Sequence, residues 1–207
     1  MSPGLVGINV IEPVVIMMTP RSGSSLIARI FKRHGLYVGP YDLRPGYPSY
    51  ENTQLKDALN RLCNCHSGLI RMRQMADDKG PDDVRQIVDE IMPHDKRWLF
   101  KTCIDAWQIW QGVYPDTRFV FVTRPVDSIV ASAASKTHGN RNVIRDIVVA
   151  RLEFMRDVAA RHGVPIVKAE QVVAGNHASL AAAFDYCGIE FQPEIAAQCV
   201  DATMWRF

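Results

Sequence analysis

Four short runs of apolar residues predict the buried strands of this chain. They cover residues 14–18, 98–100, 119–122 and 164–167. Each run is apolar throughout, without the alternation of apolar and polar residues that a half-exposed strand shows. Strands of this kind belong to a parallel sheet that helices cover on both faces. Pro165 has no amide hydrogen, so we expect the fourth strand to lie at a sheet edge or to begin near this residue.

Apolar residues at helical spacing lie between the runs. Leu26 and Ile30, like Ile27 and Phe31, stand four residues apart, and Gly35 follows them as a helix terminator. Helices are predicted over residues 25–34, 52–65 and 82–92, along a stripe from 148 to 159, and around 180–184. Residues 35–50, rich in Gly, Pro and Tyr, form a loop long enough to suggest a functional role. The order of elements predicts one α/β domain over residues 1–207, with a mostly parallel sheet and helices on both of its faces.

Composition and charge exclude several classes of protein. With 207 residues, 47% of them hydrophobic and 22% charged, the chain has the make-up of one globular domain and not of a disordered or coiled-coil protein. Lys and Arg total 24 against 22 Asp and Glu, which argues against a nucleic-acid partner. The first 20 residues contain neither Lys nor Arg, and no apolar run approaches the length of a membrane span. We therefore expect a soluble protein without membrane insertion. The five dispersed cysteines do not suggest a disulfide framework, which favours the reducing environment of the cytoplasm.

The segment between the first strand and the first helix has the composition of an anion-binding site. It combines one arginine, one glycine and three serines: Arg21, Ser22, Gly23, Ser24 and Ser25. Small residues let backbone N–H groups turn toward one point, and the following helix N-terminus adds partial positive charge. The carboxyl edge of a parallel sheet is also the usual place for a ligand in open α/β folds. We therefore expect a phosphate group to bind here; an ordinary strand–helix turn with a serine cap is the alternative.

The order of residues in this loop distinguishes between two kinds of phosphate site. A Walker A loop ends in Gly-Lys-Ser/Thr, whereas here no lysine follows Gly23, and Arg21 precedes it. The segment instead resembles the 5′-phosphosulfate loop of sulfotransferases that use 3′-phosphoadenosine 5′-phosphosulfate (PAPS), often written P-[KR]-S-G-[ST]-[ST]. The resemblance implies that the five loop residues bind the donor nucleotide, with Arg21 against the 5′-phosphate that leaves.

Residues 118–132 resemble a second block of the same family. In these sulfotransferases an arginine at a strand end and a serine eight positions later bind the 3′-phosphate, and Arg124 and Ser132 have this spacing. An arginine fork can donate two parallel hydrogen bonds to a phosphate, and a serine hydroxyl two helical turns further on can reach the same anion. The alternative is that Ser132 has only a packing role, as a small residue that lets its helix lie close to the sheet.

A lysine and several carboxylates complete the catalytic set that the resemblance implies. Lys101 stands where cytosolic sulfotransferases carry Lys-Thr-His, whose lysine contacts the sulfuryl group, but Cys103 replaces the histidine base. A thiol is a poor base near neutral pH. The remaining base candidates are, in order of preference, Asp42, Glu51, Asp105 and His138. Asp42 lies about where other branches of the family place a catalytic glutamate, and each candidate has a surface or capping role as its alternative.

The reaction that the resemblance implies is in-line transfer of a sulfuryl group from PAPS to a hydroxyl or amine of a small-molecule or carbohydrate acceptor. Adenosine 3′,5′-bisphosphate is the other product, and no metal is expected because fixed cations neutralise the donor. Two alternatives remain: a P-loop phosphotransferase with an altered loop, and a nucleotide-binding relative that has lost its base. Cys63, Cys65 and His66 are not expected to bind a metal, since cysteines two apart do not meet on one helix face.

Overall fold

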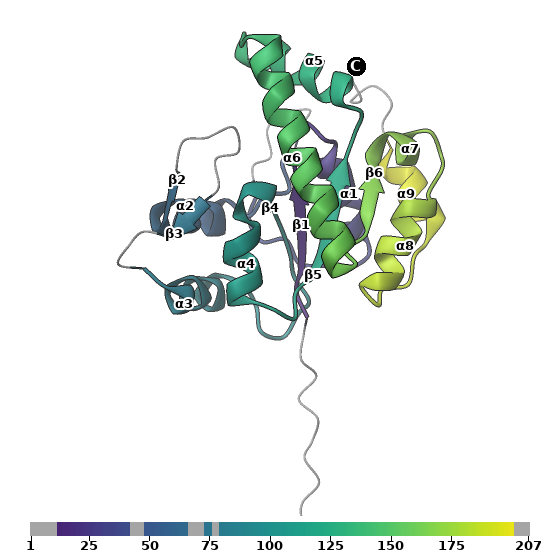
Figure 1. Cartoon of the computed structure of the whole chain (residues 1–207). Helices are drawn as coiled ribbons and strands as arrows, with labels where there is room; N and C mark the ends of the chain where they lie inside the picture. The colour runs from purple at the N-terminus through teal and green to yellow at the C-terminus, as the bar shows by residue number, and fades with distance from the viewer. Residues whose placement is uncertain (1–11, 42–47, 66–72, 76–78, 201–207) are drawn as a thin grey trace, which may run out of the picture.

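The computed structural model describes residues 12–41, 48–65, 73–75 and 79–200, with the backbone alone at 63–65 and 73–75. Its central feature is a parallel four-stranded sheet in the order β4-β1-β5-β6 (Figure 1). The strands are β1 (Val14–Met18), β4 (Leu99–Cys103), β5 (Arg118–Thr123) and β6 (Ile166–Lys168). β1 lies at the centre and pairs with both β4 and β5. The predicted α/β fold with a mostly parallel sheet is confirmed.

Helices cover both faces of the sheet, which explains why the strand sequences contain so few polar residues. Val15 and Met17 of β1 point into one core, whereas Val14, Ile16 and Met18 point into the other. The first core contains residues of α2 (Thr53–Leu62), α3 (Pro81–Ile91), α4 (Trp107–Val113), α5 (Val126–Thr137) and α6 (Arg141–His162). The second contains residues of α1 (Ser24–Arg33), α7 (Ala169–Val173), α8 (Ala178–Tyr186) and α9 (Pro193–Cys199).

The fourth strand lies at the sheet edge, as Pro165 predicted. β6 begins at Ile166 and pairs with β5 alone. Pro165 contributes only its carbonyl group, which accepts a hydrogen bond from the Phe121 N–H at 3.0 Å. The proline therefore stands where its missing amide hydrogen leaves no gap in the ladder.

The predicted helix over residues 52–65 is too long. α2 ends at Leu62, and Cys63–Cys65 instead forms a short strand, β2, which pairs antiparallel with β3 (Arg73–Met75). Backbone hydrogen bonds to a segment ten residues away decide the conformation of Cys63–Cys65, and helical periodicity does not detect such a partner. The short helices α4, α7 and α9, together with the 3₁₀ turn η1 (Ile104–Ala106), were not predicted either.

The parallel arrangement brings the carboxyl ends of all four strands to one edge of the sheet, the upper end in Figure 1. The loop after β1 leads into α1, and the residues after β5 lead into α5 at the same end. The candidate residues that follow separate strands therefore converge. Within the described ranges, no helix has both the length and the apolar character needed to cross a bilayer.

Candidate active site

The loop between β1 and α1 contains two residues in the left-handed backbone region. Arg21 has φ +74° and Gly23, the N-cap of α1, has φ +89°. The Ser22 N–H donates to the Thr19 carbonyl at 3.1 Å and closes the turn. Glycine adopts this conformation without cost, whereas for arginine it costs roughly 1–3 kcal/mol, as is common at ligand-binding loops. The turn leads directly into the first turn of α1, where helices offer backbone N–H groups to a ligand; of these, the Leu26 N–H donates to the Gly23 carbonyl at 3.0 Å.

The three serines of the loop lie in different surroundings. Ser22 is fully buried, and within the described part of the chain its hydroxyl has no hydrogen-bond partner. Ser24 is also buried, at 5% exposure. Ser25 is partly exposed; its hydroxyl donates to the Ser49 carbonyl at 3.3 Å and accepts from Lys101 at 3.0 Å. Ser25 thus connects the loop with β4.

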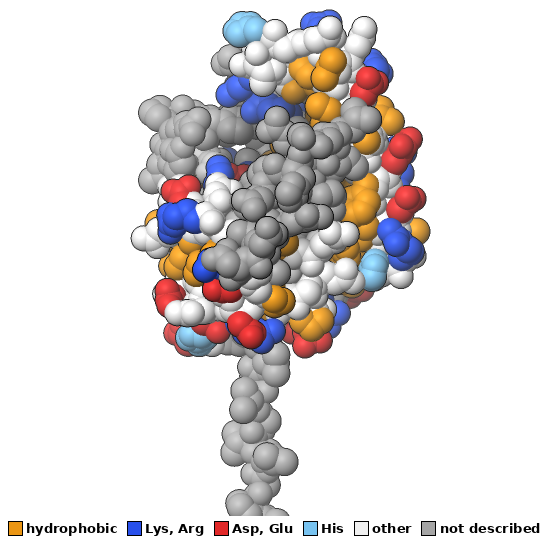
Figure 2. Space-filling model, turned by 60° about the vertical axis from the view of Figure 1, so that its left-hand side comes forward, with side chains coloured by type: hydrophobic (Ala, Val, Ile, Leu, Met, Phe, Trp, Pro, Cys, Tyr) orange, Lys and Arg blue, Asp and Glu red, His pale blue; other side chains and the backbone are white. Residues whose placement is uncertain are grey.

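The two blocks that resemble phosphate sites meet in space. Nε of Arg21 donates to the hydroxyl of Ser132 at 2.9 Å, although the two residues lie 111 positions apart in the sequence. Arg124, 7% exposed, follows β5 directly and leads into α5, the helix that carries Ser132. Figure 2 shows Lys and Arg side chains (blue) at the upper end of the molecule, where α5 lies in Figure 1. This edge of the sheet is suited to attract an anion.

Lys101 is a buried ammonium group beside the loop. It is 4% exposed, stands opposite Ile16 in the sheet, and reaches the Ser25 hydroxyl. Its Nζ also lies 3.7 Å from a carboxylate oxygen of Glu51. Burial lowers the pKa of Lys101 to about 8, against the opposing influence of Glu51, which raises it. Lys101 is therefore positively charged at neutral pH but loses its proton more readily than an ordinary lysine.

Glu51 lies between two lysines. One carboxylate oxygen faces Lys101, and the other accepts from Lys56 of α2 at 3.0 Å. Lys56 was not predicted as a site residue; its only signal in the sequence is its position five residues after Glu51, near the start of a predicted helix. The two ammonium groups orient the Glu51 carboxylate toward the sheet edge.

A cavity of about 190 Å³ opens beside this group. Its lining combines the polar side chains of Glu51, Lys56 and Lys101 with the apolar ones of Met18, Leu59 and Phe100. Cys103 also contributes to the lining. The arrangement provides a charged end and an apolar wall for a small molecule.

Comparison with known proteins decides the family. The sequence model of the sulfotransferase family matches residues 13–193. The chain belongs to the sulfotransferase family. The resemblance found in the loop and after the third predicted strand is therefore confirmed at the level of family.

Solved sulfotransferase structures share the fold. Sulfotransferase STF1 from Mycobacterium tuberculosis H37Rv is 17% identical with a TM-score of 0.55, over 94% of this chain and 72% of that one. The sulfotransferase domain of the Synechococcus PCC 7002 olefin synthase is 19% identical with a TM-score of 0.53, over 93% and 79% of the two chains. No curated protein matches this chain.

The candidate bases of this sulfotransferase lie in very different places. Asp42 falls outside the described residues. Asp105 is 5% exposed, and Arg151 donates to both of its oxygens, at 2.9 and 2.6 Å. His138 is exposed at the C-terminal end of α5. Of the described candidates, only Glu51 lies next to Lys101.

Cys103, at the position of the family's histidine, is a partly buried thiol. Burial raises the pKa of its thiol to about 11, so the thiol keeps its proton at neutral pH. A protonated thiol is not suited to accept a proton from an acceptor hydroxyl. As for metals, no cluster of three or more His, Cys, Asp or Glu side chains suited to an ion occurs among the residues that the structure describes.

Proposed function

We propose that this sulfotransferase transfers a sulfuryl group from PAPS to a hydroxyl or amine of a small-molecule or carbohydrate acceptor. The observation that carries the proposal is the 2.9 Å hydrogen bond between Arg21 and Ser132. It places the two blocks that resemble the 5′- and 3′-phosphate sites side by side, as one nucleotide with two phosphate groups requires.

The side chains at this edge fit such a donor chemically. Arg21, Arg124 and Lys101 are cationic, and Ser25 and Ser132 add hydroxyl groups. The N–H groups of the first turn of α1 add backbone donors that suit phosphate. The buried Ser22 hydroxyl, without a partner in the described part of the chain, is a further donor within the same loop. When bound, PAPS supplies the sulfuryl group that is transferred.

These residues then contact different parts of the donor. Arg21 and the α1 N-terminus stabilise the negative charge that grows on the 5′-phosphate as the bond to sulfur breaks. Arg124 and Ser132 hold the 3′-phosphate and so set the position of the whole donor. Lys101 places its ammonium group near the sulfuryl oxygens.

Glu51 is the described residue best placed to accept the acceptor's proton. Its carboxylate borders the 190 Å³ cavity, where it lies within 3.7 Å of Lys101. A hydroxyl group that enters this cavity gives its proton to Glu51 as its oxygen forms the new bond to sulfur. Asp42 stays the other candidate. The size of the cavity favours an acceptor that inserts a small end.

The cysteines bear on the cellular location. Cys103, Cys187 and Cys199 are free thiols. Free thiols fit a reducing compartment, and we place the enzyme in the cytoplasm on this ground.

Transfer from radiolabelled PAPS to a panel of phenols, alcohols and sugars, measured in the presence of a metal chelator, tests the proposal. We expect transfer to persist in chelator and to fall by about 10²–10³-fold in Arg21→Ala, the cost typical of a lost charge-stabilising group. Arg33→Ala, an exposed arginine of α1, is the matched control and should retain the native rate.

Two results would contradict the proposal. Transfer from ATP that depends on Mg²⁺ would favour the phosphotransferase alternative. Tight binding of adenosine 3′,5′-bisphosphate without turnover of any acceptor would favour a binding protein that has lost its base.

A further inference from the structure

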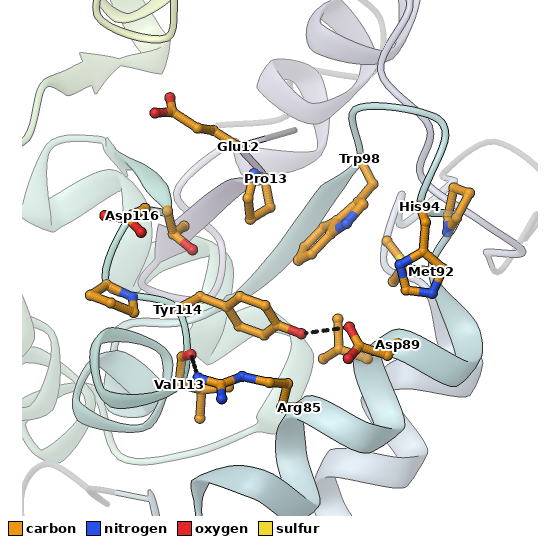
Figure 3. A pocket seen from close by; sticks show the side chains of 14 residues that line it. Glu12, Pro13, Arg85, Asp89, Met92, His94, Trp98, Val113, Tyr114 and Asp116 are labelled. Carbon is orange, nitrogen blue, oxygen red and sulfur yellow. Dashed lines mark hydrogen bonds between the residues drawn. The ribbon is translucent and has the colours of Figure 1, made fainter. Parts of the chain in front are cut away.

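A larger cavity, of about 480 Å³, lies at the opposite edge of the sheet (Figure 3). Its lining includes Pro13, Trp98 and Thr117, which come directly before β1, β4 and β5. The five residues of β1 separate this edge from the phosphate loop by roughly 16 Å, at about 3.3 Å per residue. The cavity is therefore distinct from the candidate active site, and its volume falls in the range of small-molecule sites.

Aromatic rings form two of its walls. Trp98 and Tyr114 have ring planes at 85° to one another, with centroids 6.1 Å apart. Figure 3 shows Trp98 and Pro13 on one side of the space and Tyr114 on the other. Val88 and Val113, each 1% exposed, add apolar lining. A flat apolar group can pack against these rings.

Carboxylates give the cavity a negative character. Asp89 and Asp116 both line it, and among the described residues neither forms an ion pair. Glu12 also lines it but is neutralised by Arg118, at 2.6 Å. Figure 2 shows that Asp and Glu side chains (red) are frequent along this lower end of the molecule.

Arg85, the arginine of the lining, is already engaged. Its guanidinium donates to the Val113 carbonyl at 2.8 Å, lies 3.6 Å from Asp82, and stands over one face of the Tyr114 ring. The Tyr114 hydroxyl donates to Asp89 at 3.2 Å (Figure 3). Burial and the neighbouring Asp89 raise the pKa of Tyr114, so the hydroxyl stays protonated and keeps Asp89 oriented toward the cavity.

We propose that this cavity binds an organic cation with a flat apolar body, at a site separate from the nucleotide. The body packs against the side chains of Trp98, Tyr114 and Pro13 that line the cavity, and a positive group is also attracted to aromatic rings. The cationic head lies against Asp89 and Asp116. Anionic molecules of the same shape are repelled by the two carboxylates.

Three probes that share a phenyl ring and differ in charge test this site: phenethylamine, 2-phenylethanol and phenylacetate. The readout is the indole N–H resonance of Trp98 in isotope-labelled full-length protein. Phenethylamine should shift this signal in a saturable manner and bind about tenfold more tightly than 2-phenylethanol, with phenylacetate weaker still. Saturating adenosine 3′,5′-bisphosphate should not displace it.

A pair of variants on α3 locates the charge. Asp89→Asn should bring the dissociation constant of phenethylamine to within about threefold of that of 2-phenylethanol. Glu90→Gln removes the same charge one residue further along, outside the lining, and should leave the preference intact. Equal affinities of the three probes, displacement by the bisphosphate, or equal effects of the two variants would overturn the proposal. The comparison of probes on the native chain does not depend on any variant.

Discussion

Lys101→Met lowers kcat for sulfuryl transfer by about 10²–10³-fold, while the Kd for adenosine 3′,5′-bisphosphate changes by less than about threefold. The reason is that the Lys101 ammonium, 4% exposed, is held beside the loop by Ser25 and Glu51. In the proposed mechanism it acts on charge at the sulfuryl group, which the bisphosphate product lacks. Methionine fills the buried space without the cost of desolvating a charge, so the fold should persist.

Lys56→Met is the matched control for this prediction. Lys56 contacts the same carboxylate as Lys101 but is 47% exposed. We expect its loss to lower kcat by less than about tenfold, because a solvated ion pair contributes little. Equal losses in the two variants would show that the lysines act only by orienting Glu51 and would contradict a direct role for Lys101.

The pH dependence of kcat/KM gives a second readout for Lys101. Because burial lowers the pKa of Lys101 to about 8, the ammonium is present below this pH and is lost above it. The rate should therefore fall about tenfold per pH unit above pH 8. In Lys101→Arg this alkaline limb should disappear, since a guanidinium keeps its proton to beyond about pH 12.

The free energy of unfolding should rise above pH 8, where the rate of transfer falls. The unfolded chain binds the Lys101 proton up to its ordinary pKa of 10.5, whereas the folded chain releases it near 8. The contribution of this group to stability thus rises between pH 8 and 10.5. A loss of activity above pH 8 that coincided with unfolding would not be due to Lys101.

Arg151→Met should lower the free energy of unfolding by about 3–5 kcal/mol. Both oxygens of Asp105 accept hydrogen bonds from Arg151, and the side chains are 7% and 16% exposed respectively. The pair connects α6 with the turn η1 that follows β4. Removal of the arginine leaves a buried carboxylate without its counter-charge. Urea denaturation at neutral pH measures the effect.

Arg145→Met is the control for this second prediction. Arg145 pairs with Asp127 at the surface, where the side chains are 50% and 80% exposed. Its loss should cost less than about 1 kcal/mol. A loss of similar size in Arg151→Met would mean that the buried pair contributes no more than a solvated one.

Sequence patterns predicted those parts of the fold that depend on local chemistry. The apolar run over residues 14–18 gave the central strand because both of its faces are buried. Pro165 predicted an edge strand because it lacks an amide hydrogen. The glycine and serines after residue 18 predicted the strand–loop–helix connection because small residues let backbone N–H groups turn toward one point, and Gly23 there has φ +89°.

Features that depend on distant partners did not appear in the sequence. Arg151 lies 46 residues from Asp105, and no local pattern connects them. Cys63–Cys65 left the predicted helix because its backbone pairs with Arg73–Met75. The cavity beside Trp98 and Tyr114 forms from loops before three different strands. In each case the interaction joins segments that are distant in the sequence, so it exists only in the folded chain.

Thermal unfolding with matched ligands tests whether one nucleotide spans the two adjoining anion-binding blocks. At about 100 times its Kd, adenosine 3′,5′-bisphosphate should stabilise the native chain by about 2.7 kcal/mol, which raises Tm by roughly 5–10 °C. AMP, which lacks the 3′-phosphate, should have a much smaller effect at the same concentration. Ser132→Ala should reduce the difference between the two. Equal stabilisation of the native chain by AMP and by the bisphosphate would contradict a site for the 3′-phosphate at Arg124 and Ser132.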